Sequence, residues 1–154
     1  MPKAYYSTVL EQPASMVWAA IRAFDEYAWA GAGADAEMED GRPGDAVGGI
    51  RRVTTPERPI RQRLLAHSDL DRSYTYQLCD PVPYPIHDYR ATLRVTPVVD
   101  GNRAFVEWCA TFDCALDERE HWIEHFVHAG FATWLSSLRT QLLVAAQLGG
   151  TFNR

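Results

Sequence analysis

Residues 117–150 read DEREHWIEHFVHAGFATWLSSLRTQLLVAAQLGG, and this stretch decides the fold. Asp117 is a favourable helix N-cap, and Glu120 three residues later completes a capping box. Gly149-Gly150 predicts the helix end, so the helix spans 117–148, about 48 Å at roughly 1.5 Å per residue. A buried stripe recurs at helical spacing: Ile123, Val127, Gly130, Trp134, Leu138 and Leu142. Such a long helix needs a broad apolar partner, which a curved sheet provides.

The residues before this helix have the composition and turns of an antiparallel sheet. Segments with strand character are 5–11, 36–39, 47–55, 60–68, 73–79, 86–97 and 103–115. The turn Asp100-Gly101-Asn102 has hairpin chemistry, which predicts antiparallel pairing of the last two strands. Pro13 opens a short helix after the first strand, and a second short turn is expected around Tyr27 and Trp29.

Length and composition indicate one domain over residues 1–154. The chain is 47% hydrophobic and carries a formal charge of −5, from 15 basic and 20 acidic residues. No basic block is present, which argues against nucleic acid and anionic membrane surfaces as partners. The N-terminus has no apolar run of signal-peptide type and no stretch is long enough to span a bilayer, so a cytoplasmic protein is predicted.

The sequence offers no convincing metal or cofactor site. Three cysteines without metal-ligand spacing argue against a zinc site or a disulfide framework. His121, His125 and His128 have the spacing of metal ligands on one helix face. That face lies opposite the apolar stripe, so all three histidines are expected to face solvent. We therefore predict no metal and no cofactor.

Four stretches taken in order resemble one superfamily. They are 13–18 with Ile21 and Phe24, then 47–52, then 61–65 with Asp69 and 74–76, then Tyr89 with 106–108 before the final helix. This order resembles the SRPBCC or START-like helix-grip superfamily, and its polyketide cyclase/dehydrase-like branch most. The resemblance implies an α+β fold in which a curved antiparallel sheet of six to seven strands wraps around a long C-terminal helix and encloses a cavity.

The resemblance also implies which residues line that cavity. Arg51, Gln62, Tyr89 and Glu107 match cavity-lining positions of related ligand binders, although the Gln62 position is more often Glu in them. The entrance loops would be 55–59 and 80–87. Strand alternation adds two tyrosines and the helix adds three apolar residues to the expected binding set: Tyr74, Tyr76, Val127, Phe131 and Trp134.

The sequence leaves open which face of the last strand points into the fold. Glu107 alternates with Cys109 and Thr111, whereas the opposite face carries Val106 and Trp108 and is more apolar. Only the resemblance favours an inward Glu107.

A buried Glu107 would need a partner, and Arg51 is the natural one. The two would anchor a polar ligand group or transfer protons, with Tyr89 as a third catalytic candidate. A structural ion pair and tyrosines that only pack are the alternatives to a catalytic site.

Three functions fit these features. The first is a carrier that binds a small hydrophobic molecule, such as a lipid, polyketide or aromatic metabolite, without chemistry. The second is a cyclase or dehydratase-type enzyme that uses acid–base residues of the cavity. The third is a protein-interaction module of the same fold. Whether the chain is an enzyme stays open, and a homodimer stays among the predicted partners beside the small molecule.

Overall fold

The computed structural model describes residues 1–31, 33–55 and 58–152. Its strands are β1 Lys3–Leu10, β2 Ala36–Met38, β3 Ile50–Val53, β4 Ile60–Ser68, β5 Ser73–Leu78, β6 His87–Val98 and β7 Arg103–Asp113. They form one antiparallel sheet in the order β1-β7-β6-β5-β4-β3-β2. Each predicted strand is present, with ends that differ by a few residues at most. The α+β helix-grip prediction is confirmed.

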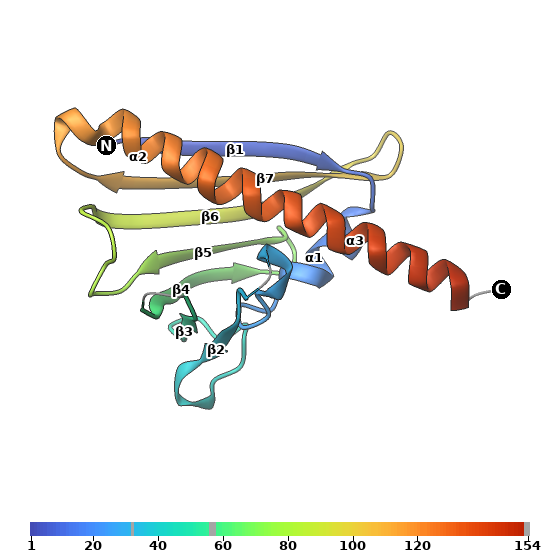
Figure 1. Ribbon diagram of the computed structural model, residues 1–154. Helices are drawn as coiled ribbons and strands as arrows, with labels where there is room; N and C mark the ends of the chain where they lie inside the picture. Colours follow the sequence, from blue (N-terminus) through green and yellow to red (C-terminus); the bar gives the residue numbers. More distant parts are fainter. Residues whose placement is uncertain (32, 56–57, 153–154) are drawn as a thin grey trace.

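Two short helical elements follow β1, as predicted. They are α1 Ala14–Ile21 and a 3-10 turn, η1 Ala28–Ala30, and a further 3-10 turn, η2 Glu39–Gly41, follows β2. The long C-terminal helix crosses the inner face of the curved sheet, and its last turns extend beyond the sheet edge (Figure 1).

The predicted hairpin between β6 and β7 is confirmed. Val98 pairs with Arg103, and the turn between them places Gly101 and Asn102 at φ 84° and 52°. These positive φ values are in the left-handed region that Gly and Asn tolerate best. The hairpin therefore fixes the register of the two longest strands, which carry the centre of the core.

The start and end of the C-terminal helix differ from the prediction. Asp117 lies in a 3-10 turn, η3 Leu116–Glu118, and the first α-helical segment is α2 Arg119–Glu124. Glu118 is its N-cap and no side chain caps it, so the predicted capping box is wrong. The final segment, α3 Thr133–Phe152, continues through Gly149-Gly150, so the predicted stop is also wrong.

A π-helical segment, η4 His125–Ala132, joins α2 to α3 and shifts the buried face. Its hydrogen bonds join residues five apart, and the buried aromatic residues Phe126 and Phe131 have this spacing. Ile123, Val127 and Trp134 of the predicted stripe are consequently only partly buried. The helix buries Gly130, Leu138 and Leu142 as predicted, and it also buries Trp122, Phe126, Phe131 and Leu135.

Alternation along β7 builds the centre of the core. The even-numbered residues from Ala104 to Phe112 are buried, and the odd-numbered ones are partly exposed. Trp108 is fully buried and stacks on Phe131 of the helix, with ring centroids 4.8 Å apart. Truncating an aromatic core residue of this kind costs roughly 3–5 kcal/mol. The apolar face of β7 therefore sets the phase of this strand.

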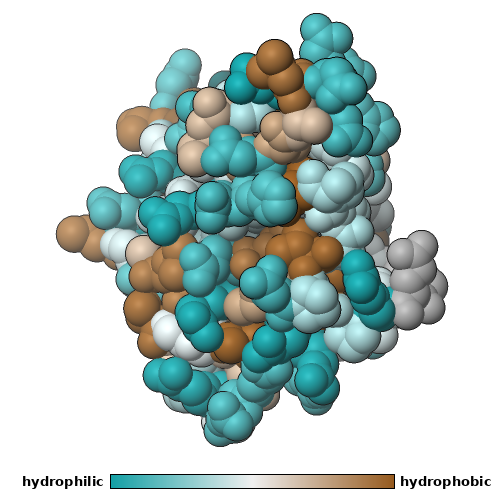
Figure 2. Space-filling model, turned by 90° about the vertical axis from the view of Figure 1, so that its left-hand side faces the viewer, coloured by the Kyte–Doolittle hydropathy of each residue, from teal (hydrophilic) through white to brown (hydrophobic). Residues whose placement is uncertain are grey.

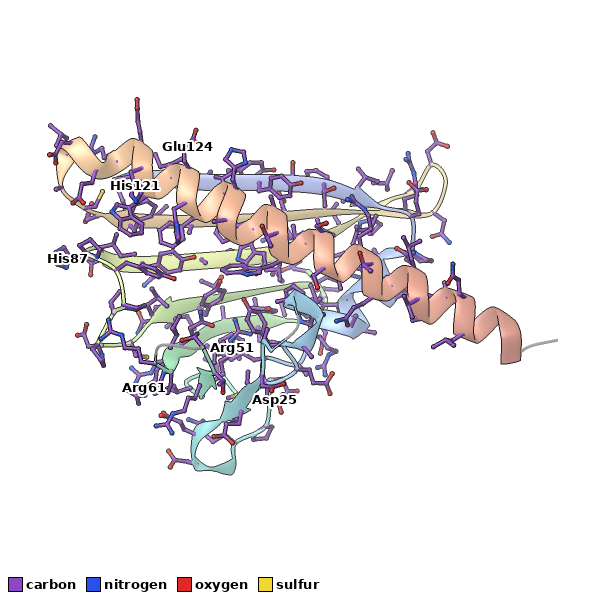
Figure 3. The ribbon with its side chains drawn as sticks, in the orientation of Figure 1. Asp25, Arg51, Arg61, His87, His121 and Glu124 are labelled. Atoms are coloured by element: carbon purple, nitrogen blue, oxygen red, sulfur yellow. The ribbon has the colours of Figure 1, made fainter. Side chains whose placement is uncertain are left out.

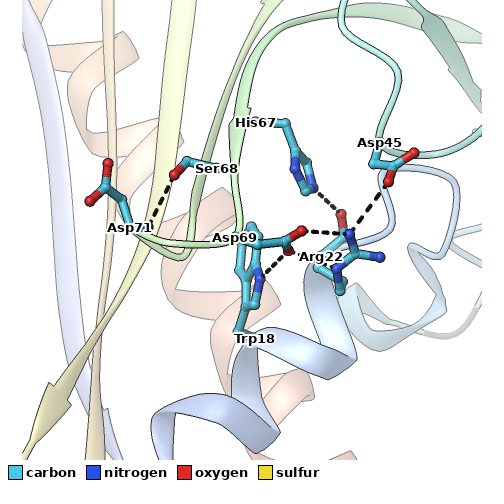
Figure 4. Close-up of polar contacts among 7 residues, drawn as sticks. All are labelled: Trp18, Arg22, Asp45, His67, Ser68, Asp69 and Asp71. Carbon is cyan, nitrogen blue, oxygen red and sulfur yellow. Dashed lines mark hydrogen bonds and ion pairs between the residues drawn. The ribbon is translucent and has the colours of Figure 1, made fainter.

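A polar clamp holds α1 to the turn between β4 and β5 (Figure 4). Trp18 Nε1 donates to Asp69 Oδ1 at 2.8 Å, and Arg22 Nε donates to the same oxygen at 2.9 Å. Arg22 Nη2 donates to Asp69 Oδ2 at 3.0 Å and also pairs with Asp45 at 3.4 Å. Hydrogen bonds from Arg22 and then Trp18 lower the pKa of Asp69 to about 2.

We expect Asp69→Asn to reduce the dependence of the free energy of unfolding on pH between about pH 4 and pH 2. The pKa of Asp69 in the folded chain lies below its ordinary value of about 3.9, so the folded state binds fewer protons there. The stabilisation is thus complete above the ordinary pKa and is lost as the pH falls towards 2. Urea unfolding at several pH values measures this loss.

Asp71→Asn is the matched control, because Asp71 lies in the same turn and is exposed. Only its backbone N–H takes part in the contacts there, as a donor to Ser68 Oγ at 3.0 Å. An equal reduction in both variants would show that the clamp is not the source of the pH dependence.

Candidate functional site

A cavity of about 350 Å³ lies between the inner face of the sheet and the π-helical segment. Aromatic and small apolar side chains make up most of its lining. Among the described residues that line it, none is Asp, Glu, Lys or Arg. The lining comprises Tyr27, Gly33, Ala34, Val53, Thr54, Thr55, Ile60, Gln62, Tyr76, Leu78, Tyr84, Tyr89, His125, Phe126, Ala129, Gly130 and Trp134.

The sheet and the helix each contribute side chains to opposite walls of the cavity. Gln62, Tyr76 and Tyr89 lie on the neighbouring strands β4, β5 and β6 at positions that alternation turns inward. The π-helical segment brings His125 and Phe126 to the opposite side. The polar groups of the sheet therefore face an aromatic helix surface across the cavity.

The predicted binding residues divide into two groups. Gln62, Tyr76, Tyr89 and Trp134 line the cavity, as the prediction placed them. The other five do not line it, and they are Arg51, Tyr74, Glu107, Val127 and Phe131.

Four of these five residues are buried or partly buried away from the cavity. Arg51 and Tyr74 are fully buried beneath the lining, and Phe131 stacks on Trp108 in the core. Val127 is partly buried and packs against the same core.

The expectation that Glu107 faces the cavity is wrong. Glu107 lies on the outer face of β7, where the Tyr5 hydroxyl donates a hydrogen bond to its Oε2 at 2.8 Å. The physical reason is the burial of the even-numbered side chains of β7, Trp108 above all, which turns Glu107 to the other face. An ion pair between Glu107 and Arg51 is therefore also wrong.

Arg51 has an unusual environment for a cation. It is fully buried and lies further inside the molecule than Arg61 (Figure 3). Its Nε donates to Gln62 Oε1 at 2.6 Å, and its Nη1 donates to the Phe24 carbonyl at 3.0 Å. The guanidinium carbon lies 3.9 Å and 4.2 Å from the ring centroids of Phe24 and Tyr27. Nη2 is buried without a hydrogen-bond partner among the described residues.

Three tyrosines of the cavity lining are neutral hydrogen-bonding groups. Burial raises the pKa of Tyr27, Tyr76 and Tyr89, while the nearby charge of Arg51 opposes the rise in each case. Trp108 Nε1 donates to the Tyr76 hydroxyl at 3.2 Å, which uses one acceptor site of that oxygen. The hydroxyl groups thus stay protonated at neutral pH and can donate hydrogen bonds to a ligand.

His125 is a cavity residue that the sequence did not predict. It is half-buried and contacts Tyr84, with ring centroids 5.4 Å apart. His121 and His128 are exposed as expected, but the π-helical segment turns His125 inward. Burial lowers the pKa of His125, and the charge of His121 lowers it further. No group of three metal-ligating side chains occurs within the described part of the chain.

Two other lining tyrosines also went unpredicted. The sequence predicts only a short turn at Tyr27, and no pattern in it indicates that this side chain points into the cavity. Tyr84 lies in the loop 80–87, which the sequence did predict as an entrance. Of the other predicted entrance, 55–59, Thr55 lines the cavity and residues 56–57 lie outside the described part of the chain.

We expect the pKa of His125 to lie below its ordinary value of about 6.5. Because burial is the larger cause and His121 the smaller, His121→Gln should raise the pKa of His125 only partly towards the ordinary value. Ring-nitrogen NMR titration measures both pKa values. A pKa at or above the ordinary value in the wild type would contradict the half-buried position of this ring.

Comparison with known proteins places the chain in a family. The family model described as "Polyketide cyclase / dehydrase and lipid transport" matches residues 1–143, and the chain belongs to this family. The family lies within the helix-grip superfamily and implies a fold that binds hydrophobic ligands. No curated protein matches the sequence. Among the described helices, none has the length and apolar character needed to cross a membrane.

Several solved structures have the same architecture. A protein from Nitrosospira multiformis is 26% identical with a TM-score of 0.76, over 91% of this chain and 95% of that one. XoxI from Bacillus cereus is 25% identical with a TM-score of 0.79, over 93% and 96% of the two chains. Norcoclaurine synthase from Thalictrum flavum, solved with dopamine and hydroxybenzaldehyde, is 12% identical with a TM-score of 0.71, over 92% and 86%. At that identity the likeness concerns the fold alone.

Proposed function

We propose that this protein binds a small hydrophobic molecule in the cavity between the sheet and the π-helical segment. The observation that carries the proposal is the composition of the lining, which is aromatic and apolar with a few polar groups on one side. This is the usual composition of a small-molecule site, in which apolar surface supplies affinity and a few polar groups fix orientation. Membership of a family that binds hydrophobic ligands supports the same function.

The size of the cavity limits the ligand. Its volume of about 350 Å³ is at the lower end of the range of roughly 300–1,000 Å³ for small-molecule pockets. A molecule of one or two rings, or a short acyl chain, suits this space better than a large lipid. The several aromatic rings of the lining favour a flat, aromatic ligand, because offset and edge-to-face contacts then form on both sides of it.

We propose that a ligand enters the cavity from one end of the molecule. His125, Ala129 and Tyr84 line the cavity from the helix and from the loop between β5 and β6. Figure 2 views this end and shows apolar surface near the centre of a largely hydrophilic face. An apolar ligand would approach through this region.

A second candidate function, acid–base catalysis on the bound molecule, is favoured by one observation. With Glu107 on the outer face, His125 is the titratable side chain of the lining whose lowered pKa keeps it neutral and able to accept a proton near pH 7. Tyr89 lies on the opposite strand wall as a protonated hydroxyl. Native mass spectrometry of freshly purified protein, followed by extraction, would identify a bound molecule on which to test turnover with His125→Phe.

We expect Ala129→Trp to weaken the binding of N-phenyl-1-naphthylamine, a neutral apolar probe, by about tenfold or more. Ala129 lines the cavity but is itself exposed, so an indole there fills space at the rim without disturbing the core. Fluorescence titration of the probe measures the dissociation constant.

Ala146→Trp is the matched control, since Ala146 is an exposed alanine on α3 outside the cavity lining. Wild type and Ala146→Trp should bind the probe saturably with equal affinity. If Ala129→Trp bound it as tightly as these two, the probe would not occupy the cavity and the proposal would fail.

A further inference from the structure

We propose that the cavity selects molecules with a negatively charged group, namely a carboxylate, phenolate or enolate attached to an apolar body. This inference rests on the proposed function and names the class of ligand. It starts from Arg51, a fully buried cation that forms no ion pair with any described carboxylate. The partner that the sequence suggested, Glu107, lies on the outer face of the sheet instead.

Such a cation is only partly compensated by its surroundings. The oxygen atoms of Gln62 and Phe24 accept two of its hydrogen bonds, and the faces of Phe24, Tyr27 and Tyr76 lie around the guanidinium. Dipoles and ring quadrupoles stabilise a cation but leave its net charge in place. The unpaired Nη2 leaves a donor unused as well. Among the described residues, Arg51 is therefore a buried positive charge that no carboxylate neutralises.

This charge lies directly behind the cavity lining. Three residues both line the cavity and contact Arg51: Gln62 through a hydrogen bond of 2.6 Å, and Tyr27 and Tyr76 through their rings at 4.2 Å and 5.2 Å. The described lining contains no carboxylate that would cancel the positive charge. A charge that lies one side chain behind the lining of a site with a low dielectric constant is only weakly screened from a ligand.

The direction of the Gln62 amide follows from the same contact. An arginine only donates hydrogen bonds, so the atom of Gln62 that faces Arg51 is the oxygen. The NH₂ group of Gln62 is then the donor that this side chain presents to the cavity. The protonated hydroxyl group of Tyr27 is a second donor in the lining. A ligand oxygen that carries negative charge would accept from these donors with the Arg51 charge behind them.

The test compares two ligands that share a ring system and differ in charge. 2-Naphthoate has a carboxylate at pH 7, and 2-naphthamide has a neutral amide of similar shape. We expect wild-type protein to bind 2-naphthoate about tenfold more tightly, which corresponds to about 1.4 kcal/mol. Isothermal titration calorimetry gives both dissociation constants, and their ratio is the readout.

Gln62→Glu is the informative variant, because it puts a carboxylate of the same shape at hydrogen-bonding distance from Arg51. The cation is then compensated within the protein, and the preference for 2-naphthoate should disappear or reverse. Gln77→Glu is the matched control: it makes the same change of charge on β5, at a residue outside the cavity lining. This control should keep the wild-type ratio, and thermal unfolding checks that both variants fold.

The outcomes separate the inference from the function on which it rests. Equal affinity of wild type for the two naphthalenes would overturn the selection of anions while N-phenyl-1-naphthylamine still binds. A ratio that persists in Gln62→Glu would overturn the assignment of that selection to the charge of Arg51. Failure of wild type to bind all three molecules would overturn the proposed function, and the inference with it. A tenfold ratio in wild type that Gln62→Glu alone removes would support both.

Discussion

The packing of Trp108 between the sheet and the helix is the interaction on which the rest of this structure depends. Its indole is fully buried, stacks on Phe131, and has Trp29 and Trp134 at ring-centroid distances of 5.9 Å and 5.2 Å. Its Nε1 donates to Tyr76, which lines the cavity. One side chain thus connects β7, the C-terminal helix, the η1 turn and the cavity, and it fixes which face of β7 is inside.

The placement of Trp108 has direct consequences for the chemistry of the site. It turns Glu107 to the outer face and leaves the described cavity lining without a carboxylate. What remains is a set of neutral donors, a half-buried His125 and a cation behind the lining. The site is therefore suited to hold an apolar molecule by its rings and to orient an electron-rich group.

Most of the fold was predictable because its signals are local. Strand alternation and the turn Asp100-Gly101-Asn102 gave the sheet and its hairpin, and apolar spacing gave the long helix. The sequence also indicates which face of β7 is buried, because the face that Val106 and Trp108 share is the more apolar one. The resemblance outweighed that signal and led to the error on Glu107.

The rest of the site depends on features with no local signal. The π-helical segment inserts a wider turn, and periodicity calculated for a regular α-helix cannot locate it. His125 was consequently assigned to the solvent face, and Val127 and Phe131 to the cavity. Tyr27 reaches the cavity from an irregular segment through tertiary packing alone. That no described carboxylate pairs with Arg51 follows from the tertiary structure, because the sequence does not show which side chains meet in the fold.

The most direct test of this account is a crystal structure of the protein grown with 2-naphthoate. We expect the naphthalene rings to lie between the sheet and the π-helical segment, against Tyr89 and Phe126, with the carboxylate towards Gln62 on the side of Arg51. A structure in which these side chains fill the cavity and 2-naphthoate is absent from it, or in which the carboxylate points away from Gln62, would contradict the account.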